Sequence, residues 1–205
     1  GRSLLMVLDE LGASPSVVFT PEHGLEGVAQ AEEPVPSGEP GEGPLVVSLY
    51  GSSKESLEPT AEQLSQLDVL VIDLVDVGSR YYTYAWSALL AARAAAKAGV
   101  HVVILDRPNP ISGDPTTLEG APQKEGFLSF VGLEPLPIRH ALTLGELVAL
   151  FAERDGLPLG PEGALSVVPT LGWERFRTAS AWGRPFSPPS PHMPTLETAL
   201  VYPGG

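Results

Sequence analysis

The chain has no cysteine among its 205 residues, and basic residues are few. Without cysteine, a disulfide scaffold, a thiolate zinc site and a cysteine nucleophile are excluded. The 12 Lys and Arg residues stand against 25 Asp and Glu, and the formal net charge is −13. A surface that follows nucleic-acid phosphates or an anionic membrane needs a basic excess, so both partners are disfavoured. No apolar run in the sequence approaches the roughly 18 residues that span a bilayer.

Signatures of several common enzyme classes are also missing. No Gly-x-Gly-x-x-Gly follows a predicted strand and no Gly-x-x-x-x-Gly-Lys-Ser/Thr occurs, so a nucleotide-using Rossmann enzyme is disfavoured. A Gly-x-Ser-x-Gly nucleophile elbow is absent too, which disfavours an α/β-hydrolase. Any reaction must therefore use other side chains.

What is present is the composition of a folded protein. Hydrophobic residues make up 43% of the chain and charged residues 18%, which is not the balance of a disordered sequence. Glycine and proline are frequent, at 22 residues each, but stay below the level of low-complexity chains. A chain of this length can bury the core of one domain, and marginally that of one and a half.

Short apolar runs alternate with helical patterns along the chain. The runs predict strands near residues 16–19, 45–49, 68–74 and 100–105, with 165–168 as a candidate last strand. Helices are predicted over 4–11 and 85–98, and after the capping boxes that begin at Thr60 and Thr143. Continuously apolar strands that alternate with helices favour a parallel sheet covered on both faces.

The pattern predicts an α/β domain built on a parallel, Rossmann-like sheet, and residues beyond about 107 are rich in loops. The first predicted helix has no strand before it, and the chain stops abruptly after Tyr202-Pro203-Gly204. We therefore expect a sequence cut from a longer protein at both ends.

Polar residues that follow the strands are the candidates for chemistry, because ligands of open parallel sheets bind beyond the carboxyl ends of the strands. Glu22 and His23 follow the first predicted strand and precede a glycine. A carboxylate there can be a general acid, a base, a nucleophile or a metal ligand, or an ordinary solvated loop residue. This pair alone supplies too few ligands for a metal. His101 begins a strand at the opposite end, which favours a structural role.

A second polar group lies between the strand at 68–74 and the Ala-rich helix. It contains Asp73, Asp76, Arg80, Tyr81, Tyr82 and Tyr84. Arg80 can pair with Asp76 or with a carboxylate of a substrate, and the tyrosines can pack in the core or offer ring faces to a sugar. Prolines fix the turn at 106–110, where Arg107 and Asn109 are either positioned ligands or turn residues.

Many segments of the chain match, in order, the motifs of one family. They are residues 19–24 with Pro-Glu-His-Gly at 21–24, and residues 48–51, 73–84, 105–110, 118–120, 129–132, 138–140, 144–147, 191–196 and 202–204. Over nearly its whole length the chain resembles the bacterial exo-β-N-acetylmuramidase (NamZ-type) family, long catalogued as a domain of unknown function. So many collinear motifs make the resemblance highly specific.

The resemblance implies a Rossmann-like domain, here residues 1–140, followed by a smaller C-terminal domain. Residues 141–205 are then expected to form a linking helix and the beginning of that second domain, with the active site in the cleft between the two domains. It implies an exo-acting glycoside hydrolase that releases N-acetylmuramic acid from the non-reducing ends of peptidoglycan fragments. A peptidoglycan saccharide is then the partner, and no nucleotide, metal or other cofactor is expected. Family members begin earlier, with a strand before the first helix, and continue further. An extracytoplasmic location, secreted or periplasmic, is the corresponding expectation.

The resemblance also implies roles for individual residues. Glu22 is the leading catalytic candidate, with His23 expected to hold or polarise it. Asp76 and Glu119 are further catalytic candidates, because glycoside cleavage conventionally uses two carboxylates, although an acetamido oxygen of the sugar can replace the second. The lactyl carboxylate of N-acetylmuramic acid requires a cation, and the candidates are Arg80, Arg107, Arg139 and His140. Tyr82, Tyr84 and Asn109 are the other predicted substrate contacts.

One cleft at the carboxyl rim of the sheet is therefore expected to bring together Glu22, Asp76, Arg80, Arg107 and Glu119. Two residues depart from the family pattern: Glu26 stands where a basic residue is usual, and His192 where an asparagine is usual. Specificity at their subsites is accordingly less well predicted than the reaction class.

Two other functions stay open. One is a catalytically inert saccharide-binding module on the same scaffold, which activity on a chromogenic muramic acid glycoside would distinguish. The other is a nucleotide-handling Rossmann-like enzyme, which a thermal-shift screen with nucleotides would test.

Overall fold

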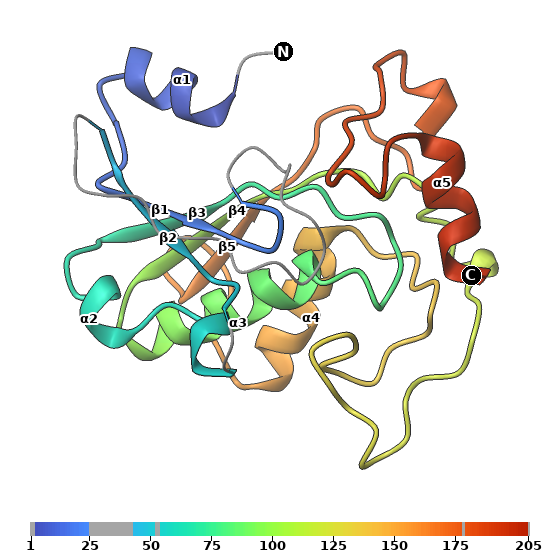
Figure 1. Cartoon of the computed structure of the whole chain (residues 1–205), viewed down its shortest axis with the longest axis horizontal. Coiled ribbons are helices and arrows are strands. Elements are labelled where there is room, and N and C mark those ends of the chain that lie inside the picture. The colour runs from blue at the N-terminus through green and yellow to red at the C-terminus, as the bar shows by residue number, and fades with distance from the viewer. Residues whose placement is uncertain (1–2, 25–42, 52–53, 178, 205) are drawn as a thin grey trace.

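The computed structural model describes residues 3–24, 43–51, 54–177 and 179–204 (Figure 1). Its strands are β1 (Val17–Thr20), β2 (Leu45–Ser48), β3 (Val69–Ile72), β4 (His101–Leu105) and β5 (Leu165–Val168). Its α-helices are α1 (Leu4–Glu10), α2 (Ala61–Leu64), α3 (Tyr84–Lys97), α4 (Leu144–Arg154) and α5 (Leu196–Val201). Short 3₁₀ turns are found at Lys54–Leu57, Pro115–Thr117, Ala179–Ala181 and Tyr202–Gly204.

The strand pairs are all parallel, which confirms the predicted α/β fold. β1 pairs with β2, and β3, β4 and β5 pair side by side in chain order. Contrary to the expectation of one continuous sheet, the described strands form two hydrogen-bonded groups. A cavity of about 830 Å³, lined by residues of β1, β3, α1 and α3, lies between these groups, so β1 and β3 do not hydrogen-bond to each other.

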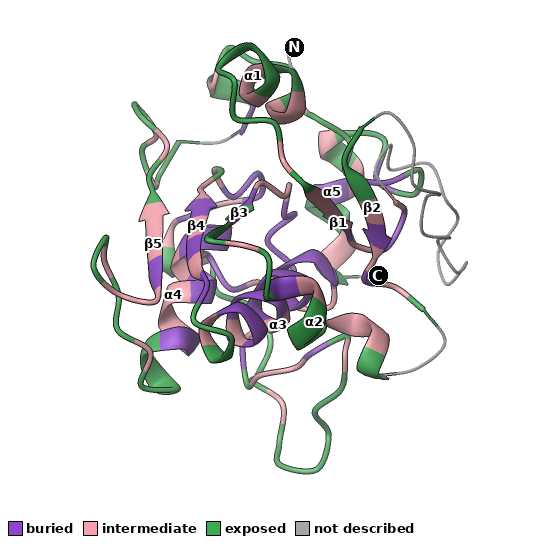
Figure 2. Ribbon diagram, turned by 90° about the vertical axis from the view of Figure 1, so that its left-hand side faces the viewer, coloured by how far each residue is buried: buried purple, intermediate pink, exposed green. Residues whose placement is uncertain are grey.

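Helices lie on both sides of the strands, as predicted. α3 and α4 cover one side and α1 lies on the other (Figures 1 and 2). Alanine, which has the highest helix propensity, dominates α3, and its small side chains allow the helix to lie close to β3 and β4. Trp86 of α3 and Phe151 of α4 are fully buried, with ring centroids 6.3 Å apart. The core thus lies between these helices and the strands above them.

The layer of strands and helices continues past the predicted domain boundary at residue 140. α4 packs against α3, and β5 hydrogen-bonds to β4 as far as Val168. After β5 the chain runs through loops to α5 and packs back against the segment that precedes α3, where the Tyr81 hydroxyl donates to the carbonyl oxygen of Tyr202 at 2.7 Å. None of the described helices is both long and apolar enough to cross a membrane.

The capping box at Thr143 joins α4 to the end of β4. The Thr143 hydroxyl accepts from the Glu146 N–H, and a Glu146 carboxylate oxygen accepts from the Thr143 N–H at 2.9 Å. The same hydroxyl donates to Asp106 at 2.7 Å, and Asp106 also accepts from the Gly145 N–H. The N-terminus of α4 is therefore fixed to the residue that follows β4.

Replacing Thr143 with Ala should lower the free energy of unfolding by about 1–2 kcal/mol, because the cap and one donor to Asp106 are lost together. Thr143→Ser keeps the hydroxyl and should recover most of this loss. Urea unfolding followed by circular dichroism measures both. Equal stability of the Ala variant and the unsubstituted protein would contradict the assignment.

Candidate active site

Glu22 lies in a tight turn directly after β1. The Gly24 N–H donates to the carbonyl oxygen of Pro21 at 3.1 Å, which closes the turn. His23 has φ 74°, the left-handed conformation that this position of a type II turn requires and that glycine usually provides. Of the described non-glycine residues, His23 and Ala141 have positive φ. Strained backbone of this kind is concentrated at functional sites.

The Glu22 side chain is held from the beginning of α3. Only 8% of Glu22 is exposed, and the Thr83 hydroxyl donates to its Oε2 atom at 2.8 Å. The Tyr84 hydroxyl lies 2.9 Å from the carbonyl oxygen of Glu22 and 2.9 Å from that of Pro189. The hydroxyl of Tyr84 therefore links the Glu22 turn to the segment that includes Pro189.

Asp76 and His140 form a second buried pair. His140 Nε2 lies 3.6 Å from Asp76 Oδ2, which also accepts from the Gly78 N–H at 2.8 Å. Burial raises the pKa of Asp76 to about 6 and lowers that of His140 to about 4. The Leu142 N–H donates to His140 Nδ1, so the neutral ring carries its hydrogen on Nε2, facing Asp76.

Two tyrosines link the Glu22 turn to the Asp76 pair. Tyr82 and Tyr84 are 6% and 5% exposed, with ring centroids 4.9 Å apart. Burial raises the pKa of Tyr84 to about 12, with the Glu22 carboxylate adding to the increase. Burial also raises the pKa of Tyr82, with smaller increases from Tyr84 and Asp76. These rings are packed in a small core, so we assign them to holding the site and not to stacking on a sugar.

Arg80 and Arg139 are both directed at main-chain oxygens. Arg80 Nη1 donates to the carbonyl oxygens of Leu136 and Ala121 at 2.6 and 2.9 Å, and Arg80 has no ion pair among the described residues. The considered Asp76–Arg80 pair is therefore not formed. Arg139 donates to the Ile111 carbonyl oxygen at 2.6 Å.

Glu119 differs from the other candidate carboxylates because it is exposed to solvent. Its side chain is 62% exposed and forms an ion pair with Arg139 at 3.4 Å. The backbones of the two residues also pair, since each N–H donates to the other's carbonyl oxygen. Glu119 thus belongs to a surface pair, whereas Glu22 and Asp76 are enclosed.

Arg107 is the most exposed of the predicted cations for which the structure gives an ion pair. It donates to Asp73 Oδ1 at 2.6 Å, and its side chain is 45% exposed. Asp73 lines the cavity between β1 and β3, as do Pro21 and Gly24 on either side of the Glu22–His23 pair. The cavity lining therefore includes the partner of Arg107 and the two neighbours of the Glu22–His23 pair, but not Arg107, Glu22 or His23 themselves.

Asn109 is a buried turn residue. Its Oδ1 accepts from the Ile111 and Ser112 N–H groups, and its amide nitrogen donates to the Leu142 carbonyl oxygen at 3.0 Å. Gly78 has φ 80°, and a Cβ atom there would lie 2.3 Å from Asn109 Oδ1, so only glycine fits. We therefore assign Asn109, like the buried His140, to supporting the site and not to contacting substrate.

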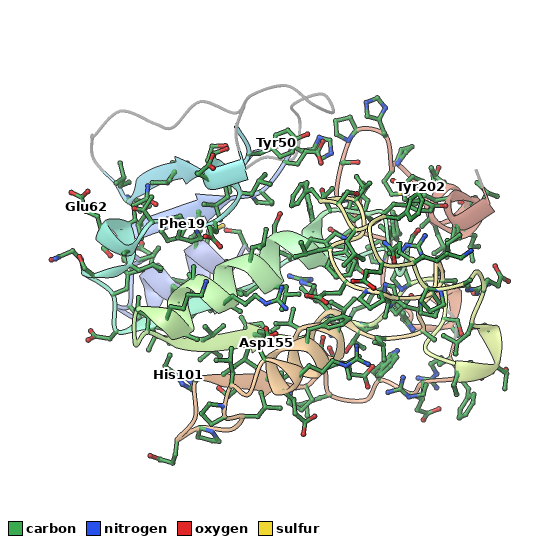
Figure 3. The ribbon with its side chains drawn as sticks, turned by 90° about the horizontal axis from the view of Figure 1, so that it is seen from below. Phe19, Tyr50, Glu62, His101, Asp155 and Tyr202 are labelled. Atoms are coloured by element: carbon green, nitrogen blue, oxygen red, sulfur yellow. The ribbon has the colours of Figure 1, made fainter. Side chains whose placement is uncertain are left out.

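The remaining predicted residues lie elsewhere. His101 bonds to the Gly163 carbonyl oxygen and the Ser166 hydroxyl, which is a structural role, and Figure 3 shows it at the opposite end of the molecule from Tyr202. His192 is exposed, and Glu26 falls outside the described residues. Within the described segments, no three His, Asp or Glu side chains are grouped to hold a metal ion.

Thr83 is the site residue that the sequence analysis did not find. Its position directly before a helix indicates an ordinary N-cap, and its partner Glu22 is 61 residues away in the chain. Only the approach of the β1 turn to the beginning of α3 reveals the contact.

Comparisons with known proteins show which family and which fold the chain shares. The sequence model of the family "Exo-beta-N-acetylmuramidase NamZ, N-terminal" matches residues 1–197. The chain is 39% identical to the peptidoglycan beta-N-acetylmuramidase NamZ of Bacillus subtilis, over 98% of this chain and 48% of that protein.

Two crystal structures of DUF1343 family proteins from Bacteroides fragilis have the same fold. The first, BF0371, has a TM-score of 0.82 and 34% identity, over 98% of this chain and 49% of the other. The second, BF0379, has a TM-score of 0.70 and 29% identity, over 98% and 51%. The chain therefore spans about half the length of the relatives that it matches.

Proposed function

The chain belongs to the exo-β-N-acetylmuramidase NamZ N-terminal family, a family of peptidoglycan glycoside hydrolases, and from this premise we propose its reaction. We propose that the protein removes N-acetylmuramic acid from the non-reducing ends of peptidoglycan fragments. Glu22 is the general acid that protonates the departing glycosidic oxygen. The observation that carries this assignment is the enclosure of the Glu22 carboxylate in a strained turn, held by Thr83.

The other carboxylates are less suited to this role. The Asp76 carboxyl group is engaged within the fold: Oδ1 is fully buried, and Oδ2 faces His140 and accepts from the Gly78 N–H. Glu119 is exposed to water and paired with Arg139, whereas an acid that protonates a leaving group works best where water is excluded. Glu22 combines enclosure with a fixed position. The acetamido oxygen of the substrate can then serve as the nucleophile.

Arg107 is proposed to bind the lactyl carboxylate of N-acetylmuramic acid. Arg80 and Arg139 use guanidinium nitrogens on main-chain oxygens, and His140 is buried and neutral. The Arg107 side chain is 45% exposed and is paired with Asp73, which lines the same cavity as Pro21 and Gly24. Its other N–H groups can donate to the carboxylate of a substrate while Nε keeps its hydrogen bond to Asp73.

Replacing Arg107 with Ala should therefore raise KM for a muramic acid glycoside by about 10-fold and leave kcat nearly unchanged. The corresponding N-acetylglucosamine glycoside lacks the lactyl group and provides an internal control, because its turnover should not change. Steady-state kinetics on the two glycosides measures the difference. An equal loss on both would remove Arg107 from recognition of the lactyl group.

The proposed function itself is tested with a chromogenic β-glycoside of N-acetylmuramic acid. Release of the chromophore, with N-acetylmuramic acid as the sole sugar product from a peptidoglycan fragment, would support exo cleavage. Saturable binding of the sugar without turnover would instead indicate an inert saccharide-binding module. Stabilisation by nucleotides in a thermal-shift screen, with no effect of muramic acid, would favour the nucleotide-handling alternative.

A further inference from the structure

Thr83 occupies the N-cap position of α3 but does not cap the helix with its side chain. Its backbone is already helical, with φ −72° and ψ −15°, and its hydroxyl makes no bond to the first turn. Thr60 and Thr143, at the same position of α2 and α4, are extended and do cap their helices. The hydroxyl of Thr83 is used elsewhere: it donates to Glu22 Oε2 at 2.8 Å.

The contact between Thr83 and Glu22 is enclosed. Both residues are 8% exposed, and a hydrogen bond to a carboxylate is stronger and more directional away from water. α3 is itself fixed by the buried Trp86, whose indole N–H donates to the Arg80 carbonyl oxygen at 2.7 Å. The Thr83 hydroxyl therefore lies at the beginning of a fixed helix and can hold the Glu22 side chain, which lies in a turn after the short strand β1.

We propose that Thr83 is a positioning residue that directs the Glu22 carboxyl group at the glycosidic oxygen. This inference rests on the proposed role of Glu22 as the acid. The hydroxyl fixes Oε2 and with it the direction of the carboxyl group. The proton moves from the Glu22 carboxyl group to the departing oxygen as the bond between that oxygen and the anomeric carbon breaks. Thr83 itself gives up no proton.

The test compares Thr83→Val, which keeps the shape of the side chain, with Thr83→Ser, which keeps the hydroxyl. The Val variant should lose about 10- to 100-fold in kcat on a natural disaccharide with little change in KM, because a displaced acid lowers the rate of the chemical step. The Ser variant should recover most of that loss. Because Thr83 does not cap α3, the helix should still form in the Val variant, and a thermal melt establishes that the variant is folded before the kinetics are compared.

A matched control lies four residues before Thr83. Ser79 is fully buried, its hydroxyl has no hydrogen-bond partner within the described residues, and it does not line the cavity between β1 and β3. Ser79→Ala removes a buried hydroxyl from the segment that leads into α3 and should leave kcat unchanged. The defect of Thr83→Val should also shrink on a glycoside with a nitrophenolate leaving group, which needs less protonation, whereas a purely structural defect should not depend on the leaving group.

The outcomes separate this inference from the proposed function. If Glu22→Gln is inactive while Thr83→Val is fully active, Thr83 has no positioning role and Glu22 keeps its own. If Thr83→Val and Ser79→Ala lose the same activity, or the Val defect is equal for good and poor leaving groups, the inference is overturned. Full activity of Glu22→Gln would remove both residues from the mechanism.

Discussion

Replacing Glu22 with Gln should reduce turnover of a natural disaccharide by about 10²–10⁴-fold, the usual contribution of a general acid. Glutamine has nearly the same shape and can still accept from the Thr83 hydroxyl, but it has no proton of suitable acidity for the leaving group. Folding and sugar binding should therefore survive. Steady-state kinetics measures turnover, a thermal melt measures folding, and a binding isotherm measures sugar binding.

The dependence on leaving group separates the two chemical roles that Glu22 can have. If Glu22 is the acid, a glycoside that releases a stable phenolate should be cleaved by the Gln variant at a much higher relative rate. If Glu22 is the nucleophile, no leaving group rescues the variant. Glu153→Gln, at an exposed position of α4, is a control that should keep full activity. Near-normal turnover of the disaccharide by Glu22→Gln would contradict the assignment.

The parallel strands and the principal helices follow from local features of the sequence. Apolar runs such as 69–72 indicate strands, and the two capping boxes place the first residues of α2 and α4 correctly. The expectation that such a strand is covered on both faces is wrong for β3, in which Val69 and Val71 are 47% and 38% exposed. Strand ends then direct attention to Glu22, Asp73 and Arg107, because parallel strands bring such residues to one rim. These inferences need only neighbours in the sequence or the direction of a strand.

The contacts within the site could not be predicted in the same way. Arg80 follows Asp76 by four residues, which suggests a local ion pair, yet its guanidinium reaches the carbonyl oxygens of Leu136 and Ala121. Tyr82 and Tyr84 face one another in a buried cluster because the segment around Met193 covers them. Such choices depend on which distant loops pack together. The same applies to the gap between β1 and β3, since strand pairing is decided by tertiary structure.

The buried Asp76–His140 pair also predicts how stability changes with pH. In the folded protein Asp76 binds its proton below a pKa of about 6, compared with 3.8 for an ordinary aspartate. His140 binds its proton only below a pKa of about 4, compared with 6.5 for an ordinary histidine. Between pH 4 and 6 the folded pair carries one proton on Asp76, and the unfolded pair carries one on His140. The two states bind equal numbers of protons, so the pair adds almost no slope to stability against pH.

Replacing either partner should make the free energy of unfolding depend on pH through the remaining group. The two variants should change in opposite directions. In Asp76→Asn, His140 of the unfolded chain binds a proton below about pH 6.5. His140 of the folded protein binds a proton only below a pKa of about 4. Relative to the unsubstituted protein, stability should then fall by about 3 kcal/mol as the pH decreases through this range. In His140→Asn, the folded protein binds a proton on Asp76 below about pH 6, and the unfolded chain does so only below 3.8. Its relative stability should rise by about 3 kcal/mol as the pH decreases.

Urea unfolding of the purified protein at pH intervals from 4 to 7.5 measures both slopes. The difference between each variant and the unsubstituted protein cancels the contributions of the other titrating groups. Asp68→Asn removes an exposed carboxylate next to β3 and should give a curve parallel to that of the unsubstituted protein. Opposite slopes require that burial acts on both groups, since it disfavours the charged form of each. Slopes of the same sign would contradict the effect of burial on at least one of the two groups.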